Sequence, residues 1–141
     1  MKKKNTNDLQ SELTAAPNLS RFLSMNQEQF VNENFVDMLQ ALFQKSGLSK
    51  AALAKRAGTS EVYLYQILSG MRTPSRDRTI CLCFGLPATL EQTQELLKRS
   101  GFAQLYARNR RDAIIMYGLI HGMELLEVND RLFAENEATL C

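Results

Sequence analysis

The chain has 141 residues, of which 45% are apolar and 23% charged, with a formal net charge of +2. This composition fits a small globular protein with one hydrophobic core and argues against a fibrous or wholly disordered chain. No apolar run is long enough to cross a membrane, and the start MKKKNTNDLQ lacks the apolar stretch of a signal peptide, so we expect a cytoplasmic protein. Cys81, Cys83 and Cys141 are too few for a disulfide framework, and we assign them no redox role.

Residues 1–18 are polar and show no helical period. We therefore expect them to be disordered, within an N-terminal arm over residues 1–33 that is largely flexible. Leu19, Phe22 and Leu23 predict a short helix inside this arm. A stronger apolar stripe runs from about Asn34 to Lys45 and predicts the first helix of a bundle.

Residues 48–74, LSKAALAKRAGTSEVYLYQILSGMRTP, are typical of two short helices joined by a tight turn. Ser49 is placed to cap the first helix, and Gly58 to adopt the positive φ that ends it. Ser60 is placed to cap the second helix, which runs to Ser69 before Gly70 and Pro74. At about 100° per residue, one side of the second helix is apolar and the other is free. The apolar side holds Leu64, Ile67 and Leu68, and the free side holds Val62, Tyr65, Gln66 and Ser69.

Two more helices follow the motif. Ser75 caps one that ends at Gly85, with Ile80, Cys81 and Phe84 facing the core. Thr89 begins the next, which ends at Gly101. Five helices therefore fit between Asn34 and Ser100, and we assign residues 34–100 to one domain.

Residues 101–141 form a C-terminal helical extension in this interpretation, with helices from Asp112 to His121 and from Glu124 to about Asn136. They carry more apolar residues than two short helices can bury alone, namely Ile114, Ile115, Leu119, Ile120, Leu125, Leu126, Val128, Leu132 and Phe133. Two explanations stay open: a lid on the bundle, or an interface of a homodimer. One surface could serve both.

Charge is divided unevenly along the chain. Residues 45–78 carry +5, residues 79–111 carry +3, and residues 112–141 carry −5. A basic segment that overlaps the two-helix motif is what a polyanionic partner requires, because each phosphate neutralised by Lys or Arg releases counterions.

The motif resembles, without gaps, the helix-turn-helix of the Cro/C1-type (XRE) repressor family. The matching residues are Leu48, Ser49, Leu53, Ala54, Gly58, Ser60, Leu64, Ile67, Gly70 and Pro74. The resemblance covers roughly residues 34–86 and implies an all-α, five-helix, lambda-repressor-like DNA-binding domain, here with an N-terminal arm and two extra C-terminal helices. Thr59, Leu68, Tyr63 and Tyr65 depart from the family pattern, which bears on the choice of bases rather than on the fold.

The resemblance and the helix geometry together predict a site on double-stranded DNA. We expect base reading in the major groove by Glu61, Val62, Tyr65 and Gln66. We expect phosphate contacts from Ser49, Lys50, Ser60, Arg72, Arg76 and Arg78. Glu61 has a second explanation, because an acid in the first turn of a helix is favoured by the macrodipole.

Nothing in the sequence points to catalysis, a metal or a cofactor. His121, beside Gly122, is expected at a helix end, and Cys81 and Cys83 fall on different faces of their helix. The leading hypothesis is a sequence-specific transcriptional regulator, a homodimer on a two-fold symmetric operator, and not an enzyme. The alternative is a protein-interaction module or antitoxin-like protein that binds another protein through its C-terminal helices.

Overall fold

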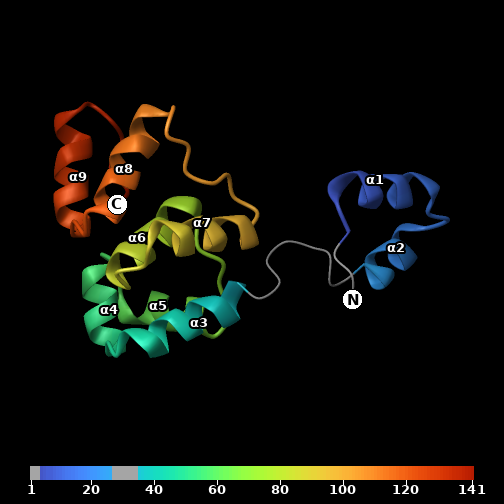
Figure 1. Cartoon of the computed structure of the whole chain (residues 1–141). Helices are drawn as coiled ribbons and strands as arrows, with labels where there is room; N and C mark the ends of the chain where they lie inside the picture. The colour runs from blue at the N-terminus through green and yellow to red at the C-terminus, as the bar shows by residue number, and fades with distance from the viewer. Residues whose placement is uncertain (1–3, 27–34) are drawn as a thin grey trace.

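The structure is a computed structural model that describes residues 4–26 and 35–141, and over these residues it is all-helical (Figure 1). The helices are α1 (Thr6–Ala15), α2 (Leu19–Met25), α3 (Phe35–Ser46), α4 (Lys50–Arg56), α5 (Glu61–Leu68), α6 (Arg76–Gly85), α7 (Leu90–Arg99), α8 (Arg110–Ile120) and α9 (Leu125–Ala134). The predicted all-α class is confirmed, and α3–α7 are the five helices expected between residues 34 and 100. Across the two described ranges, each helix is too short or too polar to span a bilayer.

The N-terminal segment is more structured than the sequence suggested. The expectation that residues 1–18 lack a helix is wrong, since α1 occupies Thr6–Ala15. Its formation rests on local signals: the Asn5 side chain accepts a hydrogen bond from the Asp8 amide, and the Lys4 ammonium lies 2.6 Å from the Glu12 carboxylate. The pKa of Glu12 is lowered by its hydrogen bond from Lys4. The short helix predicted around Phe22 is confirmed as α2.

The flexibility of the arm over residues 1–33 stays a prediction. Residues 1–3 and 27–34, and with them Asn34 at the predicted start of the first bundle helix, lie outside the described residues.

Helix α6 is the centre of the fold. All its residues from Thr79 to Gly85 are buried, and the helix packs against α4, α7 and α9. A helix that is buried on every side needs apolar or small residues on every face. The sequence TICLCFG provides them, since it contains no charged residue. Cys81 and Cys83 do fall on different faces, and both are buried because both faces are covered.

The predicted helix starts of the motif are confirmed by their caps. The hydroxyls of Ser49, Ser60 and Ser75 each accept a hydrogen bond from the backbone amide three residues later, at 3.1–3.2 Å. Gly58 has φ +66° at the end of the α4 turn, in the left-handed region that favours glycine. These local features set the angle between α4 and α5.

The predicted end of α6 at Gly85 is confirmed. Gly85 is the last residue of the helix, and Leu86 follows as the C-cap. A Cβ at Gly85 would lie 2.9 Å from Leu53 Cδ1 and 3.2 Å from the Ala57 Cβ. Glycine is therefore required here because α4 crosses α6 closely.

The C-terminal helices complete the core, as the lid hypothesis predicted. The buried apolar residues of the extension, in the helices and in the segments before and after them, belong to the same hydrophobic cluster as those of α3–α7, namely Leu105, Ile115, Leu119, Leu125, Val128, Leu132 and Leu140. Helix α8 begins two residues earlier than predicted because the Asn109 side chain accepts a hydrogen bond from the Asp112 amide and caps the helix there.

Two reciprocal ion pairs join the starts of α6 and α8. The Arg76 Nη2 lies 3.1 Å from Asp112 Oδ2, and the two terminal nitrogens of Arg111 each lie 3.1 Å from an oxygen of Asp77. Arg76 also donates to the carbonyl of Ala103, and Arg111 to that of Ala138. We call these four charged residues the Arg–Asp clasp. It fixes the extension to the helix that directly follows the motif.

Candidate nucleic-acid interface

Helix α5 has one buried side and one free side, as predicted. Leu64 and Ile67 are 0% exposed, whereas Val62 is 68% and Tyr65 52% exposed. Glu61 is exposed and Gln66 half-buried. The packed side anchors α5 to α3 and α4, so the free side is presented on a rigid support.

The serines that cap α4 and α5 can each still donate a hydrogen bond. The hydroxyls of Ser49 and Ser60 accept hydrogen bonds from Ala52 and Tyr63 in their own helices. A hydroxyl that accepts in this way still has its own hydrogen to donate, for example to a phosphate oxygen. Capping and an anion contact are therefore compatible roles.

Lys50 and Tyr65 bring α4 and α5 together at the exposed surface. The Lys50 ammonium lies 5.1 Å from the centroid of the Tyr65 ring. This cation–π contact orients the flexible lysine side chain over the free side of α5. The predicted phosphate contact Lys50 and the predicted base contact Tyr65 are thus neighbours.

Tyr63 holds two arginines on the opposite flank of the motif. The guanidinium carbons of Arg72 and Arg78 lie 5.3 and 5.8 Å from the centroid of its ring. Arg78 also donates to the carbonyl of Gly58 at 3.3 Å. This positioning role of Tyr63 was not predicted, because nothing in the sequence pairs Tyr63 with residues nine and fifteen positions later.

A polar hollow of about 640 Å³ lies between the starts of α5 and α6. It is lined by Gly58, Ser60, Ser75 and Arg78 among others. Two helix N-termini border it, and their free amide groups favour an anion. The hollow brings Ser60 and Arg78 together, both of which were predicted to contact phosphate.

Arg76 does not lie with this set. It was predicted to contact phosphate because it follows the motif, but its Nε and both terminal nitrogens donate to Ala103, Gln104 and Asp112. We therefore remove Arg76 from the phosphate contacts. Its role is in the Arg–Asp clasp.

The remaining chemistry-bearing residues have structural roles. His121 is the C-cap of α8, and its ring lies 4.1 Å from that of Tyr117. Burial raises the pKa of the Cys83 thiol to about 12 and raises that of Cys81 as well, so neither is a nucleophile at neutral pH. In the described parts of the chain, no three His, Cys, Asp or Glu side chains are grouped to hold a metal.

Comparison with known proteins agrees with this geometry. Residues 35–96 match the model of a family described as a helix-turn-helix domain. No curated protein and no solved structure gave a significant match to the chain. The matched segment begins at the first residue of α3 and ends within α7, so it contains α4, α5 and α6 complete. Residues 35–96 are therefore similar to a helix-turn-helix domain, in agreement with the geometry of α4 and α5.

Proposed function

We propose that this protein binds double-stranded DNA in a sequence-specific manner, with α5 in the major groove, and acts as a transcriptional regulator. The free side of α5 is the observation that carries the proposal. Its side chains stand out from a helix whose other side is fully packed, and cations lie on both flanks. A surface helix of this kind fits the major groove, whose width admits one helix.

Within this proposal, Glu61, Val62, Tyr65 and Gln66 contact the bases. The Gln66 amide suits adenine through two hydrogen bonds, the Val62 side chain suits a thymine methyl group, and the Glu61 carboxylate suits a cytosine amino group. Tyr65 supplies an exposed ring next to Lys50 for stacking against a sugar or base.

The phosphate contacts come from Ser49, Lys50, Ser60, Arg72 and Arg78. They fall on both sides of α5, Lys50 over the Tyr65 ring and the two arginines over the Tyr63 ring. Contacts on both sides of the reading helix would hold it in register between the two DNA backbones. These contacts add affinity for any sequence rather than preference for one.

Selection from a library of random duplexes tests the proposal. The full chain should enrich one motif, and its affinity for that motif should fall steeply with salt because several phosphates are neutralised. Enrichment of no motif and no salt-dependent binding to duplex DNA would contradict it. The protein-interaction module would then be the better hypothesis.

We also propose that the regulator is a homodimer formed through the outward side of α8. Tyr117 and Ile120 are exposed there, beside a groove of about 460 Å³ that Arg110, Arg131 and Glu135 border. A border with both signs of charge is able to match a second copy of itself across a two-fold axis. Two linked motifs would then read two half-sites.

Light scattering tests the dimer. Tyr117→Glu should convert a dimer to a monomer, whereas Leu126→Glu should not, because Leu126 is also an exposed apolar residue but does not line this groove. A wild-type monomer at micromolar concentration, or equal effects of the two variants, would contradict the proposed interface.

A further inference from the structure

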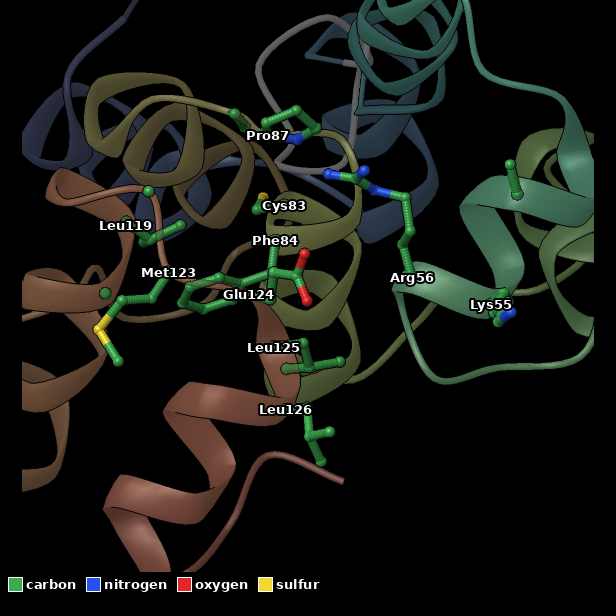
Figure 2. Close-up of a pocket in the computed structure, with 14 residues that line it drawn as sticks. Lys55, Arg56, Cys83, Phe84, Pro87, Leu119, Met123, Glu124, Leu125 and Leu126 are labelled. Atoms are coloured by element: carbon green, nitrogen blue, oxygen red, sulfur yellow. The ribbon is translucent and has the colours of Figure 1, made fainter.

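A second hollow lies away from the free side of α5 and is not used by the proposed function. It has a volume of about 630 Å³ and is bounded by α4, the end of α6 and the connection between α8 and α9 (Figure 2). Pockets that hold small organic ligands are commonly of this size. The hollow is thus formed jointly by the helix-turn-helix domain and the extension.

Most of its lining is apolar. Phe84 lies near the middle of the hollow, Leu119 and Met123 on the side of the α8–α9 connection, and Leu125 at the start of α9 (Figure 2). Phe84, Leu119 and Leu125 belong to the core cluster, with Met123 packed against it. The lining therefore continues the core surface outward and favours an apolar ligand body.

Two cations from α4 line the opposite side. Arg56 donates from Nε to the Gly85 carbonyl at 2.9 Å, which fixes its guanidinium while leaving both terminal nitrogens without a partner among the described residues. Lys55 precedes it and has no ion pair within residues 4–26 and 35–141. Figure 2 shows Arg56 reaching from α4 toward Pro87. A held guanidinium with free terminal nitrogens suits a carboxylate or sulfonate.

Glu124 is the one acid that lines the hollow. Its carboxylate offers an acceptor for a hydroxyl or amide group of a ligand. Against Arg56 and Lys55 it leaves the lining with an excess of positive charge, so the lining favours an anionic ligand.

We propose that this hollow binds a small organic anion whose apolar body is an aromatic or branched aliphatic group. The body packs on Phe84, Leu119 and Leu125, and the acid group pairs with Arg56, with Lys55 adding to the positive potential. The apolar part of this site lies away from the free side of α5, although Lys55 also lines the polar hollow beside Ser60 and Arg78, and binding to it is measured without DNA.

Two fluorescent probes of matched shape test the proposal. The anionic probe is 8-anilinonaphthalene-1-sulfonate, and the neutral probe is N-phenyl-1-naphthylamine, which has the same rings without the sulfonate. The folded full chain should bind the anion about tenfold more tightly than the neutral probe, since one charge-assisted pair is worth roughly that factor. Equal affinities would overturn the assignment of an anion.

Variants locate the site. Ala52→Phe places a ring in the hollow and should abolish binding of both probes, whereas Ala51→Phe, on the exposed side of the same helix, should change neither. Circular dichroism checks that both variants fold. If Ala52→Phe leaves probe binding unchanged, the probes bind elsewhere and the proposal is wrong.

A substitution that removes a charge without adding volume gives an independent test. Arg56→Gln should weaken binding of the sulfonate about tenfold and leave the neutral probe unaffected. Lys98→Gln, which removes an exposed cation on α7, is the matched control and should change neither affinity. An equal loss in the two charge variants would show that only net charge matters, and would overturn the role of Arg56.

Discussion

Helices α3–α7 and the C-terminal extension share one hydrophobic core but carry net charges of opposite sign. Residues 35–100 carry +4, whereas residues 101–141 carry −2. In Figure 1, α6 and α7 lie between α5 and the α8–α9 pair. Helices α6 and α7 thus separate most of the extension from α5, although Leu125 and Cys141 of the extension lie close to Gly58 in the turn between α4 and α5.

The two regions are also joined differently from two independent domains. The Arg–Asp clasp links the starts of α6 and α8, while Ile115 and Val128 pack into the core of α3–α7. Contacts of both kinds cross the boundary that sequence reasoning placed near residue 100. We therefore infer that the extension is part of the folding unit rather than an addition to it.

Truncation after Ser100 should have the largest effect, because it removes this shared core. Ile115, Leu119, Leu125, Val128 and Leu132 are all buried, and each such side chain contributes about 1.5–3 kcal/mol. Their sum rivals the roughly 5–15 kcal/mol of a whole domain. We expect residues 1–100 to be largely unfolded by circular dichroism. A truncated protein that melts like the full chain would show that the two regions are separate after all.

Asp112 should be the most sensitive single residue of the clasp. Its side chain is 9% exposed, and it accepts hydrogen bonds from Arg76 and from the Tyr106 amide. Asp112→Asn leaves the Arg76 charge without its partner and should cost about 3–5 kcal/mol of unfolding free energy. Asp77→Asn is the matched control: its side chain is 40% exposed, and the loss should be about 1 kcal/mol or less. Urea titration measures the unfolding free energy of both variants. Equal losses would contradict the prediction that the Arg76–Asp112 pair contributes more than the Arg111–Asp77 pair.

The sequence predicted α3–α7 well because their ends carry local signals. Ser49, Ser60, Ser75 and Thr89 each cap a helix within three residues of themselves, and Gly58 marks its turn by its own φ. Such signals need no knowledge of distant residues. The free side of α5 was predicted for the same reason, because helical periodicity alone separates it from the packed side.

The features that were missed depend on residues far apart in the sequence. Arg76 was wrongly predicted to contact phosphate, because its actual partner Asp112 is 36 residues away, in a region that the sequence assigned to a separate extension. The contact of Tyr63 with Arg72 and Arg78 likewise forms only when the motif is folded. At Gly85 the deciding neighbour is Leu53, across the α4–α6 crossing. Pairings of this kind have no local sequence signal.

Gly118 offers a finer test of how closely the extension is packed. A Cβ there would clash with Val128 Cγ2 and lie 3.3 Å from the Phe84 ring. Gly118→Ala, in the last turn of α8, would ordinarily stabilise a helix, but overpacking at this contact should destabilise the protein by about 1–3 kcal/mol. Urea titration gives the sign. A more stable variant would mean that α8 and α9 separate easily and that the extension is loosely attached.

The two regions also differ in that α3–α7 are proposed to bind DNA and the extension is not. Substitution of Gln66 tests this difference. Gln66→Ala should cost about 1–3 kcal/mol of affinity for the selected motif and relax preference at one position of each half-site. Arg72→Ala should instead weaken binding to all duplexes and lower the salt slope by about one unit, because Arg72 is proposed to contact phosphate. Repeated selection and salt titrations separate the two effects.

An arginine of the extension is the control for these measurements. Arg110, on α8, is paired with Glu135 and Glu137, and Arg110→Ala removes the same charge as Arg72→Ala. If only the helix-turn-helix domain binds DNA, Arg110→Ala should leave both the affinity and the salt slope unchanged when they are measured on a single half-site, because the proposed dimer groove that Arg110 borders plays no part in binding one half-site. An equal change in slope for Arg72→Ala and Arg110→Ala would mean that DNA responds to net charge alone. An unchanged motif after Gln66→Ala would show that α5 is not in the proposed register.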